Sequence, residues 1–423
     1  SWDISDDGLT YTFHIRDAVH SNGDAVTAQD AHFSITKISD PNTAYGFVFD
    51  PIETMEVLDD KTLRIKLKHK YSAFASGISL FSAAVVSQKA YEADPEAFGN
   101  NPTCSGAFLV ESFKRGDRLV LVANENHWGG RPNLDRVEML YVPEGNSRVI
   151  GLKSGDYDVI TGVPFSQAKA IGSTAGLNLE TKTVFKLEYV YLNHDAAPIN
   201  SKDVRLALNY AANIDAIMKA VYFGYGEKPN SYNPKMSFHD PSVEGIPYDM
   251  DKAKELVAKS YDGTKIELNI DAGNAPSKQI ATILQQGWTE AGLNVEIVEA
   301  DGGTNWGKIE KGDYQATVSY ITSDINDDDE LAILQADYTG GAKAFFTNYN
   351  NPEVTAILRQ AREESAPADR AKLYGQAQEI VLWDGYSVPL NYTPAMNGYA
   401  DHVQGWRNLT TGWWWLKDVW LDK

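Results

Sequence analysis

The feature that most restricts the fold of this chain is a regular alternation of strand and helix patterns between residues 265 and 320. Apolar residues alternate where a half-buried strand is expected, and they recur on one face where a helix is expected. The pattern predicts strand, helix, strand, helix and strand at residues 265–270, 277–291, 293–297, 306–311 and 314–320. Units of this kind form parallel sheets, and ligands bind beyond the carboxyl ends of their strands. Ser323 and Asp324 follow the third strand, so we expect both at that edge.

The rest of the chain predicts a second α/β region and two connections. Roughly the first 180 residues combine short strands with helices, as expected of a separate domain in a chain of this length. Strands are predicted at residues 9–15, 62–67 and 118–123, and helices after Thr27 and at residues 203–221 and 369–382. Extended segments at residues 184–193 and 387–392 connect the two regions. Two such crossings are what a hinged, two-lobed protein needs, because a few residues can absorb a rigid-body closure.

Composition excludes several classes of protein. The 38 Lys and Arg against 58 Asp and Glu give a formal net charge of −20, which is the wrong sign for binding nucleic acid or an anionic membrane. Cys104 is the single cysteine, so neither an intramolecular disulfide nor a cysteine-based metal site can form. No stretch reaches the roughly 20 apolar residues that a membrane-spanning helix needs.

Motifs for catalysis are also absent, and we expect neither an enzyme nor a bound metal or cofactor. The chain contains no GxSxG, GxxxxGK[ST], HExxH or GxGxxG motif, and its eight His are scattered. A glycosidase with two carboxylates is disfavoured because no acid pair is tied to one site by spacing. The acidic run after Asp324 fails as a calcium loop, because Asp329 replaces the glycine at position six and Gln335 the glutamate at position twelve.

Two groups of residues have both a structural and a ligand-binding interpretation. Residues 327–330 are expected to form a solvated helix start, whereas Asp324 could receive a cationic ligand group. The aromatic surplus of ten Trp and 22 Tyr includes Trp413, Trp414 and Trp415. We expect these rings to pack mainly on the first lobe, with one side of the extended segment buried and the other reaching a cleft. Further aromatic candidates lie on the extended crossings, at Tyr189, Tyr191 and Tyr392.

The chain resembles the extracellular solute-binding proteins of family 5, which serve the oligopeptide, dipeptide and nickel class of ABC importers. The resemblance covers nearly the whole chain. It rests on residues 2–16, 22–23, 26–30, 124–132, 152–158, 203–211, 312–314 and 388–390, which begin with WDISDDGLTYTFHIR and include LKSGDYD and DVRLALNYA.

The resemblance implies a two-lobed, Venus-flytrap fold of the periplasmic-binding-protein type, similar to cluster C. We expect residues 1–187 and 391–423 to form the first lobe, with a family-specific subdomain, and residues 188–390 to form the second. It further implies a periplasmic or extracellular monomer, with or without a membrane tether, that delivers its solute to a membrane permease. Family members begin some tens of residues earlier, so an N-terminal part is expected to be missing here.

The resemblance also implies the ligand site. In peptide-binding members an Asp after the strand pairs with the ligand's α-amino group, and Asp324 matches it. A family loop that lies at the cleft matches residues 101–108 here, although Cys104 and Ala107 replace its glycine and proline. The family's Gly-Trp is Tyr320-Ile321, and its Asp-Pro is Asp327-Asp328. The predicted ligand-binding residues are Asp324, Ser323, Tyr320, Tyr189, Tyr191, Tyr392, Cys104, Ser105, Gly106 and Trp414.

The functional hypothesis is capture of a small peptide or another amine-bearing solute in an interlobe cleft, with Asp324 as the ammonium partner. The alternative is an oligosaccharide or opine-like solute bound through aromatic stacking. The sequence does not identify the ligand.

Overall fold

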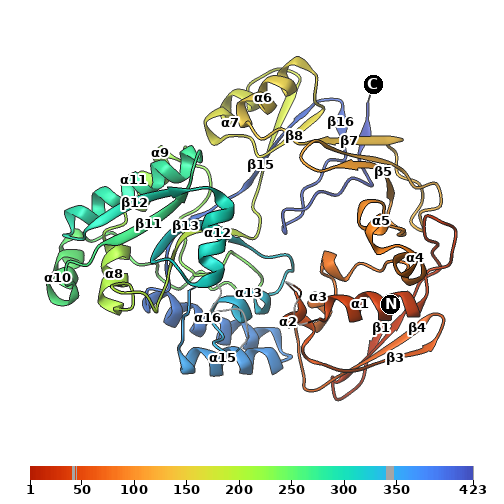
Figure 1. Ribbon diagram of the computed structural model, residues 1–423, viewed down its shortest axis with the longest axis horizontal. Coiled ribbons are helices and arrows are strands. Elements are labelled where there is room, and N and C mark those ends of the chain that lie inside the picture. The colour runs from red at the N-terminus through yellow and green to blue at the C-terminus, as the bar shows by residue number, and fades with distance from the viewer. Residues whose placement is uncertain (41–42, 44, 340–346, 423) are drawn as a thin grey trace. The chain divides into compact units, whose positions relative to one another are not determined.

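A computed structural model describes residues 1–40, 43, 45–339 and 347–422, and the chain divides into two units (Figure 1). Unit 1 comprises Ser1–Lys182 and Ala395–Lys423, and unit 2 comprises Thr183–Pro394. Unit 2 is therefore a continuous insertion in a discontinuous unit 1. The division proposed from the sequence lies a few residues away, at 187/188 and 390/391.

Unit 2 is built on a sheet with the strand order β12-β11-β13-β10-β14. β11 pairs in parallel with β12 and β13, whereas β10 pairs antiparallel with β13 and β14. The described elements are β10 (Lys186–Leu192), α8 (Lys202–Tyr210), α9 (Ile214–Ala220), α10 (Met250–Ser260), β11 (Ile266–Asp271), α11 (Ala275–Glu290), β12 (Val295–Ala300), α12 (Gly302–Lys311), β13 (Ala316–Thr322), α13 (Asp329–Gln335), α15 (Pro352–Glu363), α16 (Pro367–Trp383) and β14 (Ser387–Tyr392). This confirms the predicted β-α-β-α-β unit.

Local signals explain why α11 forms between β11 and β12. The Asn274 side chain accepts a hydrogen bond from the Ser277 amide at 3.1 Å and caps the helix start. After the C-cap, Gly292 has a φ of 101°, a conformation that glycine adopts without strain. Trp288 is fully buried, and its indole N–H donates to the Leu208 carbonyl at 2.8 Å. These features fix α11 against α8.

Two helix predictions in unit 2 need correction. Residues 203–221 form two helices, because the Asn213 side chain accepts from the Ala216 amide at 2.9 Å and starts α9 anew. In α16 the bounds are as expected, but the buried stripe is rotated. It contains Arg370, Tyr374, Ala377 and Val381. Of the face that the sequence predicts, through Leu373, Ala377 and Ile380, Ala377 is buried and the other two are partly buried. An arginine on the apolar stripe signals a buried ion pair.

Unit 1 contains several small sheets instead of one continuous sheet. Their strand orders are β1-β2-β4-β3, β5-β6-β7, β8-β15-β9 and β16-β17, all antiparallel. The described elements are β1 (Trp2–Ile4), β2 (Thr10–His14), α1 (Ala28–Ile38), α2 (Gly46–Phe49), β3 (Ile52–Asp59), β4 (Thr62–Leu67), α3 (Phe74–Gly77), the 3-10 turn η1 (Phe81–Ala83), α4 (Gln88–Ala93), α5 (Pro95–Asn100), β5 (Phe108–Lys114), β6 (Arg118–Ala123), β7 (Arg136–Leu140), α6 (Gly145–Ser154), β8 (Val159–Thr161), α7 (Phe165–Gly172), β9 (Leu177–Lys182), β15 (Ala395–Ala400), β16 (Val403–Gln404) and β17 (Trp420–Leu421).

Several predictions in unit 1 are confirmed by the structure. The strands expected at residues 9–15, 62–67 and 118–123 are β2, β4 and β6. α1 begins after Thr27 with a capping box, in which the Thr27 hydroxyl accepts from the Asp30 amide and the Asp30 carboxylate accepts from the Thr27 amide. Among the described residues of both units, no helix is long and apolar enough to cross a membrane.

Candidate functional site

The loop that follows β13 carries the first group of predicted site residues. We call residues 323–330 the acidic loop. Ser323 is fully buried, Asp324 is half-buried, and α13 begins at Asp329. The Ser323 hydroxyl donates to the Glu330 carboxylate at 2.6 Å, and the Asp324 amide donates to the same oxygen at 3.1 Å. The main chain beside Asp324 is therefore tied to the first turn of α13.

The second half of the acidic loop is buried, which contradicts the expected solvated helix start. The exposed fractions of residues 327–330 lie between 0% and 5%. Arg370 donates two hydrogen bonds to the Asp327 carboxylate, at 2.8 and 2.9 Å. Arg362 donates to Asp329 at 2.8 Å and to Asp337 at 2.7 Å. The arginines come from α16 and α15, which lie beside each other, so helices distant in sequence supply the countercharge (Figure 1).

Burial also changes the protonation of two carboxyls in this loop. Burial raises the pKa of Asp328 to about 7, although the hydrogen bond from the Phe238 amide acts against it. Burial likewise raises the pKa of Glu330 to about 7, against the hydrogen bond from Ser323 and with the nearby charge of Asp324. Among the described residues, no group of three or more His, Cys, Asp or Glu could hold a metal ion. The loop is thus a network of ion pairs and titrating carboxyls.

Tyr320 lies on β13 just before the acidic loop and is 56% exposed. The Lys186 ammonium lies 4.6 Å from the centre of its ring, and Lys186 also pairs with Glu188 at 2.8 Å. The side chain of Tyr320 is thus held on the surface of unit 2 next to a cation. It remains able to contact a solute.

The three other tyrosines predicted as site residues lie in the core of unit 2. Tyr189, Tyr191 and Tyr392 are 0%, 1% and 5% exposed and belong to one apolar cluster. The Tyr189 hydroxyl donates to Gln335 at 2.9 Å, and the Tyr191 hydroxyl donates to the Tyr320 carbonyl at 3.2 Å. Alternation along β10 places both rings on the same buried face. The structure therefore favours the packing interpretation of these tyrosines over the ligand-contact interpretation that the sequence also allowed.

In unit 1, the predicted cleft loop is held by hydrogen bonds to the main chain. The Cys104 carbonyl accepts from the Ser21 amide at 2.9 Å, and the Asn124 side chain donates to the Gly106 carbonyl at 2.7 Å. Cys104 and Ser105 are half-buried, and Gly106 is exposed. This loop thus has a defined shape with an exposed tip.

The C-terminal aromatics of unit 1 are exposed, which contradicts their expected packing into the core. We call residues 405–419 the tryptophan loop; it connects β16 and β17. Trp413, Trp414 and Trp415 are 48%, 39% and 41% exposed. The main chain of this loop bonds to itself, with the Leu409 amide donating to the Trp413 carbonyl at 2.7 Å. All three rings are thus partly exposed, and neither face of the segment is buried as the sequence predicted.

Trp413 and Trp414 each contact another aromatic ring of unit 1. The ring centre of Trp413 lies 5.0 Å from that of Phe81, which is itself 50% exposed. The ring centre of Trp414 lies 6.4 Å from that of Trp406, and the Trp406 indole N–H donates to Glu180 at 3.1 Å. Phe81 was not predictable as a neighbour of Trp413, because the two residues are more than 300 positions apart in the sequence. Unit 1 thus carries an exposed aromatic surface.

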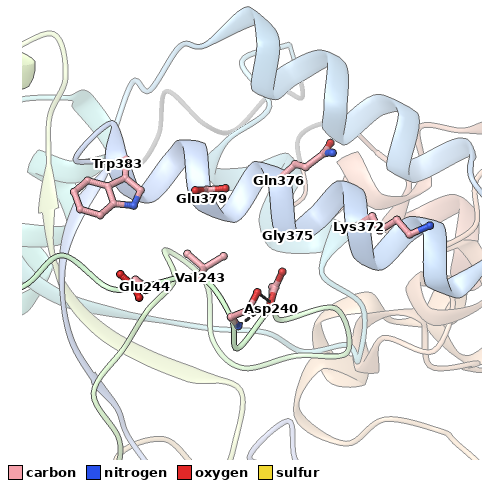
Figure 2. Close-up of a pocket in the computed structure, with 9 residues that line it drawn as sticks. Asp240, Val243, Glu244, Lys372, Gly375, Gln376, Glu379 and Trp383 are labelled. Carbon is pink, nitrogen blue, oxygen red and sulfur yellow. Dashed lines mark hydrogen bonds between the residues drawn. The ribbon is translucent and has the colours of Figure 1, made fainter.

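A groove in unit 2 lies outside all the predicted site residues (Figure 2). α16 forms one side and residues 240–244 the other. Gly375 on α16 permits the close approach of the segment 240–244, because a Cβ at residue 375 would lie 2.8 Å from the Asp240 carboxylate. Gln378 fixes the same segment by accepting from the Asp240 amide at 3.0 Å. The groove contains the carboxylates of Asp240, Glu244 and Glu379 together with the Trp383 ring, as Figure 2 shows.

Comparisons with known proteins identify the family. A family model described as "Bacterial extracellular solute-binding proteins, family 5 Middle" matches residues 1–343. The heme-binding protein A of Haemophilus influenzae is 28% identical over 438 residues, which cover 96% of this chain and 80% of the relative. The probable D,D-dipeptide-binding periplasmic protein DdpA of Escherichia coli is 27% identical over 412 residues, covering 94% and 79%. The glutathione-binding protein GsiB of Escherichia coli is 26% identical over 427 residues, covering 97% and 83%.

Solved structures show the same fold. The periplasmic binding protein DppA of Helicobacter pylori, in complex with the peptide STSA, matches with a TM-score of 0.89 and 24% identity, covering 100% of this chain and 88% of that chain. The dipeptide-binding protein of a Pseudoalteromonas species, in complex with Met-Leu, matches with a TM-score of 0.89 and 20% identity, covering 100% and 90%. These matches confirm the predicted α/β, two-lobed periplasmic-binding-protein fold.

Proposed function

The chain belongs to the bacterial extracellular solute-binding proteins of family 5, and we propose that it captures a small peptide or another amine-bearing solute for an ABC importer. Proteins of this family are substrate-binding components of importers that work outside the cytoplasmic membrane. The finer proposal concerns the class of solute and the residues that recognise it.

The observation that carries the proposal is the position of Asp324. It follows the carboxyl end of β13, where parallel sheets bind ligands, and its main chain is anchored through Glu330. The exposed Tyr320 ring lies at the end of the same strand. A carboxylate on an anchored main chain at a strand end suits an ammonium group, which forms a charge-assisted hydrogen bond with it.

The names of two relatives support an amine-bearing solute. Glutathione and D,D-dipeptides, which appear in the names of the two Escherichia coli relatives, both carry a free α-amino group. Heme, which the Haemophilus relative is named for, does not. We therefore include heme as a competing ligand in the test.

The exposed aromatic surface of unit 1 favours a second candidate. Trp413, Trp414 and Phe81 present rings with large exposed fractions, and such rings can stack on the faces of sugars. An oligosaccharide or opine-like solute is thus the alternative, and it would not require the charge of Asp324.

We also propose that solute binding draws the two units together, as a hinged binding protein requires, and that the protein acts as a monomer with a membrane permease as its partner. The predicted hinge segments are β10 and β14, which are hydrogen-bonded to each other inside unit 2. Bending is easier at the irregular residues between β9 and β10 and between β14 and β15. Equal radii of gyration in solution scattering with and without the bound solute would contradict the closure.

Native mass spectrometry of the purified protein, for solutes that co-purify, tests the proposed function directly. Calorimetry then compares a pool of free dipeptides and tripeptides with the same pool after N-acetylation, and with glutathione, heme and an oligosaccharide pool. We expect free peptides to bind and acetylated ones to bind at least about tenfold more weakly, because the ammonium charge is lost. Equal binding of both pools would contradict recognition through Asp324 and support the aromatic alternative.

A further inference from the structure

Glu330, in the first turn of α13, contacts the loop that precedes its own helix. Its side chain is 2% exposed and turns back to the loop that precedes α13. One carboxylate oxygen accepts from the Ser323 hydroxyl at 2.6 Å and from the Asp324 amide at 3.1 Å. The contact closes a loop of seven to eight residues, so the direction of the chain at Asp324 depends on Glu330.

Glu330 differs from Asp327 and Asp329 in its hydrogen-bond partners, because arginines donate to those two carboxylates. The guanidinium groups of Arg370 on α16 and Arg362 on α15 both donate to other carboxylates. The hydrogen bonds described for Glu330 come from neutral groups. The charged and titratable groups that face this region, from the acidic loop and from α13, α15 and α16, are Asp324, Asp327, Asp328, Asp329, Asp337, Arg362, Arg370 and Tyr374.

We propose that Glu330 is a positioning residue for the solute: it fixes the main chain at Ser323 and Asp324, and its charge adds to the negative field that a ligand ammonium meets at Asp324. The proposal rests on the proposed function, because it takes Asp324 as the ammonium partner. Glu330 itself does not touch the solute, since it is buried behind the loop that it holds.

A linkage between binding and protons follows from this geometry. Burial raises the pKa of Glu330 to about 7, and the negative charge of Asp324 contributes to the increase. An ammonium group at Asp324 cancels that charge and favours ionised Glu330, so binding releases a proton near neutral pH. By the same linkage, affinity increases as the pH rises from about 6 to 8.

The test uses three variants of the whole chain. Glu330→Gln keeps an oxygen that can accept both hydrogen bonds but removes the titrating charge, and Glu330→Ala removes both. Glu353→Gln, an exposed residue in the first turn of α15, serves as the matched control. Hydrogen exchange of the amides at residues 323–325 is measured without ligand. Calorimetry at pH 7 in phosphate and in Tris, with the pool of free dipeptides and tripeptides, measures proton release.

We expect Glu330→Ala to raise amide exchange at residues 323–325 by about tenfold or more and Glu330→Gln to leave it within about threefold, because only the former loses the acceptor. The wild type and Glu353→Gln should release a fraction of a proton on binding, and Glu330→Gln should not. If Glu330→Ala cannot be purified in folded form, Glu330→Gln and its lost proton release carry the test.

Two results would overturn the inference: unchanged exchange in folded Glu330→Ala, or proton release by Glu330→Gln equal to that of the wild type. Failure of the proposed function has a different signature. In that case the peptide pool does not bind, or Asp324→Asn binds it as tightly as the wild type, while the exchange measurement still decides whether Glu330 holds the loop.

Discussion

The acidic loop of unit 2 and the tryptophan loop of unit 1 place their side chains in opposite environments. In the acidic loop four consecutive ionisable residues are buried, and arginines from two helices neutralise part of their charge. In the tryptophan loop three consecutive apolar rings are exposed, and the main chain is bonded mostly to itself. The difference teaches that hydrophobicity alone does not decide burial: polar residues are buried where they fix a loop, and apolar ones are exposed where few elements cover them.

The largest effect that could break this comparison is the loss of the buried ion pair between Arg370 and Asp327. Arg370→Ala leaves an uncompensated carboxylate inside unit 2, which should lower the free energy of unfolding by about 3 to 5 kcal/mol. Lys372→Ala, on the same helix, removes an exposed partner of Asp369 and should cost less than about 1 kcal/mol. Chemical denaturation of both variants measures the difference. Equal small losses would mean that the buried pair contributes no more than a surface pair.

The next effect concerns affinity instead of stability. Asp324→Asn keeps the shape of the side chain and removes its charge, which should weaken the binding of free peptides by more than about tenfold, because breaking an ammonium–carboxylate pair costs roughly 2 to 5 kcal/mol. Glu310→Gln, an exposed acid on α12, is the control and should leave affinity unchanged. Calorimetry with the free peptide pool compares the three proteins. Unchanged affinity in Asp324→Asn would remove the acidic loop from the binding site.

A smaller effect is a change of stability with pH. Burial raises the pKa of Asp328 to about 7 from an ordinary value of 3.8, so the folded state holds a proton that the unfolded chain has released above about pH 4. The free energy of unfolding therefore falls as the pH rises through this window, by roughly 1 kcal/mol for this group between pH 6 and pH 8. His239 acts in the opposite direction, because burial lowers its pKa.

Asp328→Asn isolates this contribution, since an asparagine oxygen can still accept the hydrogen bond from the Phe238 amide. Denaturation of the wild type and Asp328→Asn at pH 6 and pH 8 should show a smaller pH effect in the variant. An identical pH dependence in the two proteins would mean that Asp328 does not titrate there.

The smallest expected effect is in the tryptophan loop. Trp413→Ala removes a ring that is about half exposed and should lower the free energy of unfolding by less than about 1 kcal/mol. Trp288→Ala, in the core of unit 2, should cost about 3 to 5 kcal/mol. Thermal and chemical denaturation compare the two. A large loss in Trp413→Ala would return this ring to a packing role, whereas a loss of oligosaccharide binding with little loss of stability would favour the aromatic alternative.

Sequence patterns predicted elements whose signals are local and missed contacts between distant segments. The β-α-β-α-β unit was predictable because each of its signals is local: the alternation within a strand, the apolar face of α11 and the glycine that follows that helix. The burial of Asp327 was not predictable from its neighbours, since Arg370 lies 43 residues further along the chain. The position of Arg370 on an apolar stripe was the available signal, but the stripe predicted from the sequence, through Leu373, Ala377 and Ile380, is rotated from the buried one and does not include Arg370.

The same distinction holds for the candidate site. The place of Asp324 after β13 follows from local strand prediction together with the resemblance to family 5. Tyr189 and Tyr191 lie on the same face of β10, as the period-two alternation predicts. The alternation does not say whether other elements of the protein cover that face. That depends on Gln335 and its neighbours in α13, more than 140 residues away. The role of Glu330 as an acceptor was missed because a charged residue in the first turn of a helix was expected to be exposed to solvent.

The order in which the strands of unit 1 are made has a consequence for how the protein folds during synthesis. β15 is the middle strand between β8 and β9, yet it is translated only after the whole of unit 2. Until residue 400 leaves the ribosome, β8 and β9 lack the strand that joins them, whereas all the strands of the unit 2 sheet are already present. Contacts this distant in sequence form slowly because the loop they close is long. We therefore expect the unit 2 sheet to form before the β8-β15-β9 sheet, and β8 and β9 to stay unpaired in a chain that stops at residue 394.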